Sequence, residues 1–210
     1  MTPCRAVIFD FDGIIVESEH IKSRAFAALY REHGQDVADA VVAHHEANGG
    51  ISRRQKMRWA HRTLLGIEAD EALLEDLGRR FSALVEDEVV ACDEVPGARA
   101  VLNAEASRRP LFVVSGTPHE ELQRIVRRRG LDGYFAEVHG SPPEKPVTVR
   151  GILDRHGLAA REVLFVGDAM ADLRAARATG TRFIGRVADG KASLFPPGTP
   201  VISDLTQLVI

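Results

Sequence analysis

The stretch Ala6–Ser18, AVIFDFDGIIVES, decides the fold of this 210-residue chain. Its first four residues are apolar and include β-branched and aromatic types, which predicts a short buried strand. Asp10 and Asp12 follow, one residue apart, and Gly13 then permits a turn. Because side chains two apart on an extended chain point to one side, both carboxylates should face the same space, while Phe11 returns to the core.

Two carboxylates this close repel each other unless a divalent cation neutralises them or one of them stays protonated. Either arrangement is useful in catalysis. The alternative is an aspartate-rich turn after a strand, since Asp-Gly is common in turns. This stretch alone leaves both interpretations open.

Composition excludes several classes of partner. A net charge of −3, from 27 basic and 30 acidic residues, gives no general attraction to nucleic acid or to an anionic membrane. No apolar run approaches the roughly 20 residues of a membrane span. Cys4 and Cys92 are too few for a disulfide framework, which predicts reduced thiols and a cytoplasmic location. We expect a monomer or a weak homodimer.

Residues from about 17 to 91 have the apolar spacing of helices and contain no predicted strand. Ser18 is expected to cap the first helix, and Ser52 with Gln55 has the spacing of a capping box. Gly49 and Gly50 interrupt the pattern. The predicted helices cover about 18–34, 36–46, 52–65 and 70–88.

Beyond about residue 92, predicted strands alternate with predicted helices. The strands are expected at 111–114, 135–138, 163–166 and 182–184, with a last strand and helix from Val201. This alternation predicts an α/β fold with a parallel sheet and ligands at the carboxyl ends of its strands. We therefore expect a core of residues 1–16 and 92–210, with a helical unit of residues 17–91 inserted after the first strand.

Hydroxyl and amide groups follow the predicted strand 111–114. Ser115, Gly116 and Thr117 offer a hydroxyl and successive N–H groups ahead of a helix, which is a suitable pocket for phosphate. The same residues are also typical of an ordinary capped helix start. This signal is weak when taken alone.

A lysine and two more aspartates complete the set. Lys145 lies between prolines in a predicted loop, where its ammonium group would balance the acid pair and bind a phosphate oxygen, although most lone loop lysines are solvated. Asp168 ends the predicted strand 163–166, and Asp172 lies one helical turn later. Asp168 would complete a Mg²⁺ site, unless both residues only favour the helix start.

These four signals, each just after a strand and in this order, resemble the haloacid dehalogenase-like superfamily of phosphohydrolases. The motifs of that superfamily are DxDG, Ser or Thr, a distant Lys, and GDxxxD, which here are Asp10–Gly13, Ser115, Lys145 and Gly167–Asp172. The resemblance implies a Rossmann-like parallel-sheet core. The helical stretch resembles the type-1 cap of the β-phosphoglucomutase and phosphoglycolate phosphatase group.

The resemblance implies a Mg²⁺-dependent phosphomonoester hydrolase of a small phosphorylated metabolite, such as a sugar phosphate. Asp10 would be the nucleophile that forms an aspartyl-phosphate, and Asp12 the general acid and base. The Asp10 carboxylate, the Asp12 backbone carbonyl and Asp168 would bind Mg²⁺, with Asp172 in support. The phosphoryl group would be held by Lys145, Ser115 and the amides of Gly116 and Thr117.

Specificity should come from the helical unit. Residues 48–53 resemble the G-x-S-R stretch of sugar-phosphate enzymes, so we expect Arg53 to reach the substrate, together with His44, Asn48 and Lys56. The alternative is that Arg53 and Lys56 are exposed residues on a helix.

Three other activities compete with hydrolysis of phosphomonoesters. A β-phosphoglucomutase-type phosphomutase would use the same core, but this chain has Lys22, with His20 nearby, where the mutase pattern places a histidine. Dehalogenases of the superfamily lack the second aspartate, so Asp12 argues against dehalogenation. A receiver-like phospho-acceptor module is disfavoured by Asp12 and by the helical insertion.

Overall fold

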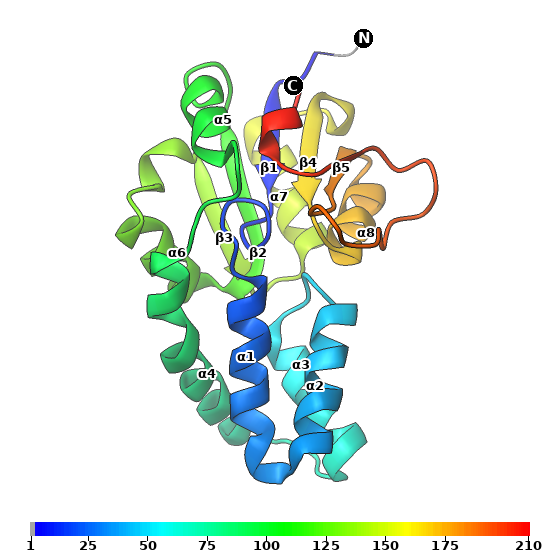
Figure 1. Ribbon diagram of the computed structural model, residues 1–210. Coiled ribbons are helices and arrows are strands. Elements are labelled where there is room, and N and C mark those ends of the chain that lie inside the picture. Colours follow the sequence, from blue (N-terminus) through cyan, green and yellow to red (C-terminus); the bar gives the residue numbers. More distant parts are fainter. Residues whose placement is uncertain (1–2) are drawn as a thin grey trace.

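A computed structural model describes residues 3–210 and contains one six-stranded parallel sheet (Figure 1). The sheet order is β3-β2-β1-β4-β5-β6, so the first strand lies between β2 and β4. All four residues of that strand are fully buried, as their apolar character predicts. The strands are β1 (Ala6–Phe9), β2 (Leu111–Pro118), β3 (Glu137–Ser141), β4 (Val163–Gly167), β5 (Arg182–Arg186) and β6 (Val201–Ile202).

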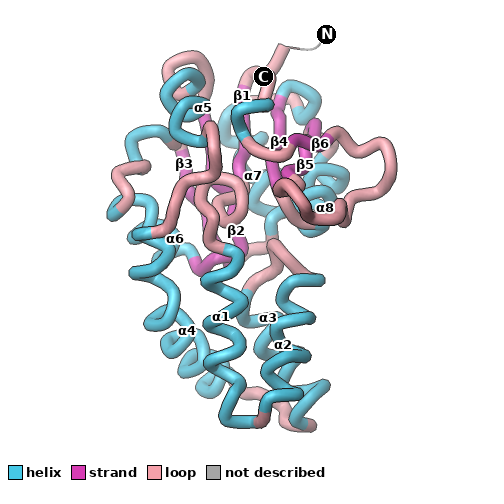
Figure 2. The backbone as a smooth tube through the Cα atoms, in the orientation of Figure 1, coloured by secondary structure: helices cyan, strands magenta, loops and turns pink. Residues whose placement is uncertain are grey.

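Four of the five α-helices between β1 and β2 lie together beyond one end of the sheet, and we call them the helical insertion (Figures 1 and 2). They are α1 (Glu19–Tyr30), α2 (Gln35–Ala47), α3 (Arg53–Ala60) and α4 (Glu71–Ala91). The other helices are α5 (Ala98–Glu105), α6 (His119–Arg128), α7 (Lys145–His156) and α8 (Met170–Thr179). The expected α/β fold with a helical insertion after the first strand is thus confirmed. The proposed domain limits at 16/17 and 91/92 stay a prediction.

The insertion has an apolar interior of its own. Phe26 of α1 and Phe81 of α4 meet with ring centroids 4.6 Å apart, and both side chains are buried. Such aromatic pairs add to the stabilisation from burial alone. None of the helices in residues 3–210 is both long enough and apolar enough to cross a membrane.

Several local predictions hold only in part. Ser18 is the N-cap residue of α1, as expected, but its side chain makes no capping hydrogen bond. Ser52 caps α3 by accepting the Gln55 N–H at 3.3 Å, but the Gln55 side chain contacts Glu144 rather than completing a capping box. Lys145 is the first residue of α7, not part of a loop. The segment after Val201 forms a two-residue strand and a 3₁₀ turn instead of a strand and an α-helix.

Candidate active site

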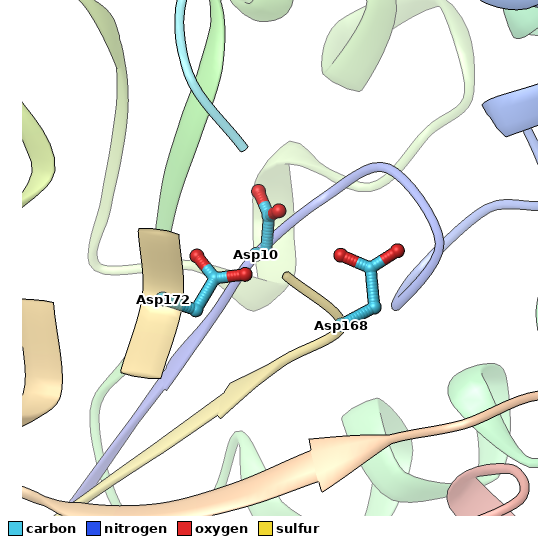
Figure 3. A group of neighbouring side chains, drawn as sticks. All are labelled: Asp10, Asp168 and Asp172. Carbon is cyan, nitrogen blue, oxygen red and sulfur yellow. The ribbon is translucent and has the colours of Figure 1, made fainter. Parts of the chain in front are cut away.

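Three carboxylates meet at the carboxyl edge of the sheet (Figure 3). Asp10 follows β1, Asp168 follows β4, and Asp172 lies in the first turn of α8. Each offers an oxygen, and these oxygens all lie within 4.8 Å of one another. The backbone N–H of Asp10 donates to the Val166 carbonyl over 2.9 Å, which extends the sheet pairing to the site.

Lys145 links two members of this cluster. Its Nζ lies 3.0 Å from Asp10 Oδ2 and 2.6 Å from Asp172 Oδ1, and all three side chains are buried. Burial alone would lower the pKa of Lys145, but Asp10 and Asp172 raise it above its ordinary value. Lys145 is therefore a permanent cation in contact with Asp10.

One lysine does not neutralise three clustered carboxylates. Burial raises the pKa of Asp10 to about 7 against the opposing effect of Lys145, and burial, with Asp10 and Glu19 nearby, raises the pKa of Asp168 well above its usual range. A divalent cation would remove this penalty, and carboxylate oxygens are the ligands that Mg²⁺ prefers. A Cβ at Gly13 would lie 2.0 Å from Asp168 Oδ2, so only glycine leaves room for this carboxylate. Both the donor set and the space around it thus fit a divalent metal.

The Asp12 carboxylate has different partners. It lies 2.5 Å from Lys22 Nζ, and it accepts hydrogen bonds from Ser18 Oγ at 2.6 Å and Thr117 Oγ1 at 2.9 Å. Burial alone would raise its pKa, but these partners, Lys22 above all, lower the pKa of Asp12 to about 2. Asp12 is therefore an anion in this conformation. The prediction that its backbone carbonyl binds metal stays untested.

The Ser-Gly-Thr triplet lies inside β2, not beyond it as expected. Ser115 Oγ accepts from the Thr117 N–H at 3.1 Å and donates to Asp12 at 3.3 Å. A Cβ at Gly116 would lie 2.9 Å from the Gly50 carbonyl oxygen of the helical insertion. The absence of a side chain at Gly116 thus allows the backbone of the insertion to pack directly against β2.

A cavity of about 50 Å³ lies between this edge and the helical insertion. Arg53 and Lys56 both line it, with only 9% and 4% of their surfaces exposed. The alternative that these two residues are exposed on a helix is therefore wrong. The guanidinium group of Arg53, however, is bound to Glu121 of α6 at 2.5 Å and to Ser82 at 3.2 Å.

His44 and Asn48 lie elsewhere. The His44 ring stacks on Trp59 with centroids 3.5 Å apart, and the Asn48 side chain donates to the His44 carbonyl at 2.9 Å. Neither belongs to the described residues that line the cavity. Their role in substrate binding remains a prediction.

Outside residues 48–53, five residues that line the cavity were not expected from the sequence to contact substrate. One available signal was the spacing of Lys22 and Phe26, which places them on one face of a helix. Glu121 carried no signal, because only folding brings α6 beside the helical insertion. The five are Lys22, Phe26, His45, Phe81 and Glu121.

We expect Glu121→Gln to lower the free energy of unfolding by about 3 kcal/mol, because it leaves Arg53 buried without its counter-charge. Urea unfolding measures this difference. Glu120→Gln is the matched control, since Glu120 is exposed and should change stability by less than about 0.5 kcal/mol. Equal stability of the two variants would show that the pair does not hold the insertion onto the core.

Comparison with known proteins gives consistent matches along most of the chain. A phosphoglycolate phosphatase of Pectobacterium atrosepticum is 26% identical over 196 residues, which are 88% of this chain and 81% of that enzyme. A phosphorylated carbohydrates phosphatase of Thermotoga maritima is 26% identical and covers 90% of this chain and 89% of its own. The solved structure of YfnB from Bacillus subtilis, bound to magnesium, superposes with a TM-score of 0.70 at 20% identity, over 97% of this chain and 96% of that one.

A family model also matches most of the chain. Residues 4–180 match the family of haloacid dehalogenase-like hydrolases, from before β1 to the end of α8. That range contains the acidic cluster, Lys145, the Ser-Gly-Thr triplet and the whole helical insertion. This chain belongs to the haloacid dehalogenase-like hydrolase family.

Proposed function

We propose that this protein is a Mg²⁺-dependent phosphatase that hydrolyses a small phosphorylated metabolite through an aspartyl-phosphate intermediate. The observation that carries the proposal is the contact of Lys145 with both Asp10 and Asp172 inside a buried acidic cluster. Phosphoryl transfer requires a nucleophile in line with the leaving group and neutralisation of the charge on the phosphoryl oxygens. The activities after which the relatives are named, on phosphoglycolate and on phosphorylated carbohydrates, support the same class of substrate.

Asp10 is the nucleophile in this proposal. Its Oδ1 accepts the Phe11 N–H at 2.7 Å and its Oδ2 lies beside Lys145, so the carboxylate is held in one orientation. One carboxylate oxygen forms a bond to phosphorus as the bond to the leaving oxygen breaks. Lys145, the Ser115 hydroxyl and the N–H groups of Gly116 and Thr117 bind the phosphoryl oxygens.

The carboxylates of Asp10, Asp168 and Asp172 would hold Mg²⁺, which would neutralise charge on both the nucleophile and the phosphoryl group. The amide N–H of Ala169 donates to Asp172 at 3.0 Å, and Lys145 binds the other oxygen of that carboxylate. Because both oxygens of its carboxylate have partners, Asp172 also has the contacts of a residue that orients the other metal-binding residues.

Asp12 is the proton carrier in this proposal. To protonate the leaving oxygen it must first gain a proton, which its contact with Lys22 opposes. Substrate must therefore displace Lys22 from Asp12 before the first step. In the second step the same carboxylate takes a proton from the water that attacks phosphorus, while the bond between phosphorus and the Asp10 oxygen breaks and phosphate leaves. Thr117 and Ser18 keep it oriented throughout.

The test is phosphate release from a broad panel of phosphomonoesters, measured with Mg²⁺ and with chelator. We expect turnover of small phosphorylated acids or sugars with Mg²⁺ and none with chelator. If no ester is turned over while the protein is folded and binds Mg²⁺, hydrolysis is not its activity.

Mg²⁺ should also stabilise the fold, and more strongly at pH 8 than at pH 5. At pH 5 the raised pKa values of Asp10 and Asp168 keep protons on these carboxylates, and metal must displace them. In metal-free protein the pH dependence of stability has the opposite sign. Because folding raises the pKa of Asp10 to about 7, the free energy of unfolding falls as pH rises from about 4 to about 7. We expect excess Mg²⁺ to raise Tm by about 5–10 °C at pH 8. An equal rise at both pH values would contradict this metal site.

A further inference from the structure

Lys56 of α3 is a buried cation without a carboxylate partner. Only 4% of its surface is exposed, and its Nζ lies 2.7 Å from His45 Nδ1 and 3.3 Å from the His45 carbonyl oxygen. Its Nζ also lies 5.9 Å from the centre of the Phe26 ring. Within residues 3–210 it forms no ion pair with an acidic side chain. Burying an unpaired charge is costly, so such a residue calls for an explanation.

The other charged groups that line the cavity are paired. Asp10 has Lys145, Asp12 has Lys22, and Arg53 has Glu121. Among the charged residues that line the cavity, Lys56 is therefore the one without an oppositely charged side chain in contact.

His45 does not compensate that charge. Burial, with the nearby Lys56, lowers the pKa of His45 to about 3, so its ring is neutral and Nδ1 accepts the hydrogen bond from Lys56. Burial and the charge of Lys22 lower the pKa of Lys56 itself to about 7. An anion beside Lys56 would raise the pKa of Lys56, against the effects of burial and of Lys22. The contacts orient the ammonium group and leave its charge available to a ligand.

The cavity is small and its wall is partly apolar. Its volume is about 50 Å³, and on the same scale a single water molecule needs roughly 10–15 Å³. Phe26 and Phe81 line it together with Lys56, Asp10 and Asp12. Even after substrate displaces Lys22 from Asp12, a cavity of this size suits a short ligand. A carboxylate, which is planar and has two oxygens, fits beside Lys56 better than a second phosphate.

We propose that Lys56 binds a carboxylate of the substrate, so that the substrate class is a short phosphorylated carboxylic acid. The inference rests on the proposed function, because it places the phosphate at Asp10 and Lys145 and the carboxylate at Lys56 of the helical insertion. Arg53, which the sequence favoured for this role, is already neutralised by Glu121.

Two matched esters test the proposal: 2-phosphoglycolate, which has a carboxylate, and 2-hydroxyethyl phosphate, which has a hydroxyl group instead. For wild type we expect a higher kcat/KM on the carboxylated ester. Lys56→Met should reduce that preference by about 10- to 100-fold, the range for loss of a charged hydrogen bond. The reduction should lie mainly in KM, since the carboxylate is remote from the reacting atoms. Arg58→Met is the matched control, because Arg58 is exposed on the same helix.

The ratio of kcat/KM for the two esters, measured on one variant, does not depend on how much of that variant is folded. Calorimetric binding of both esters to Asp10→Asn protein, with and without Lys56→Met, gives a second readout that needs no turnover. If wild type hydrolyses neither ester, the broad ester panel decides whether the proposed function fails, while the binding preference still decides the role of Lys56. An unchanged preference in the Lys56→Met protein would overturn the inference. A stronger Lys56-dependent preference for a short bisphosphate than for 2-phosphoglycolate would overturn the assignment of a carboxylate.

Discussion

Asp10→Asn should reduce Mg²⁺-dependent phosphate release by about 10⁴-fold or more, on the scale of losses seen when a covalent nucleophile is removed. The amide has nearly the same shape as the carboxylate but lacks the anionic oxygen that attacks phosphorus. The structure predicts no unfolding to confuse the result. Burial and the neighbouring Asp172 raise the pKa of Asp10, so the metal-free fold does not depend on its charge, and Lys145 still pairs with Asp172.

Acid-quench trapping of a radiolabelled phosphoenzyme tests the same step directly. Wild type should form an alkali-labile phosphoenzyme that Asp10→Asn lacks, and Asp36→Asn, at an exposed site in α2, should behave as wild type. Phosphate release by Asp10→Asn at the wild-type rate would exclude Asp10 as nucleophile. A phosphoenzyme that persists with no turnover would instead indicate a receiver-like module.

Lys145→Met should lower kcat/KM by about 10²- to 10³-fold, the usual scale for the loss of one electrostatic contact to the transition state. The substitution removes the cation that contacts both Asp10 and Asp172 and that is placed to bind a phosphoryl oxygen. It also leaves buried carboxylates without their lysine, so metal-free protein should lose stability and excess Mg²⁺ should restore part of it. Steady-state kinetics and thermal unfolding with and without Mg²⁺ measure the two effects.

Lys191→Met is the control for general loss of positive charge. Lys191 is exposed and pairs with Glu19 at the surface, so its removal should change kcat/KM by less than about threefold. If Lys145→Met and Lys191→Met had the same small effect, Lys145 would be a structural residue and the proposed binding of the phosphoryl group would be wrong.

The core of the site was predictable because its residues follow strands. A buried parallel strand is recognisable as a short apolar run, and residues after such strands meet at one edge of the sheet. The sequence alone therefore places Asp10 and Asp168 at one site. Lys145 was assigned to the right site but the wrong element, because the prolines around it indicated a loop and in fact accompany the first turn of α7.

The residues that line the cavity from the helical insertion were less predictable. A helix pattern shows which residues share a face, but not what that face will meet. Arg53 was expected to bind substrate, and the structure pairs it with Glu121, which lies 68 residues away in the sequence. His44 was a candidate, whereas its neighbour His45 is the histidine that lines the cavity and contacts Lys56.

The sequence by itself therefore determined the α/β core, the helical insertion and the chemistry of the acidic edge, since apolar runs and side-chain alternation are local properties of the chain. Only the tertiary structure decided which cations are neutralised. Lys22 pairs with Asp12, Arg53 pairs with Glu121, and Lys56 remains without an acid. Charge pairing depends on distances between residues far apart in the chain, and these exist only after the insertion has packed onto the core.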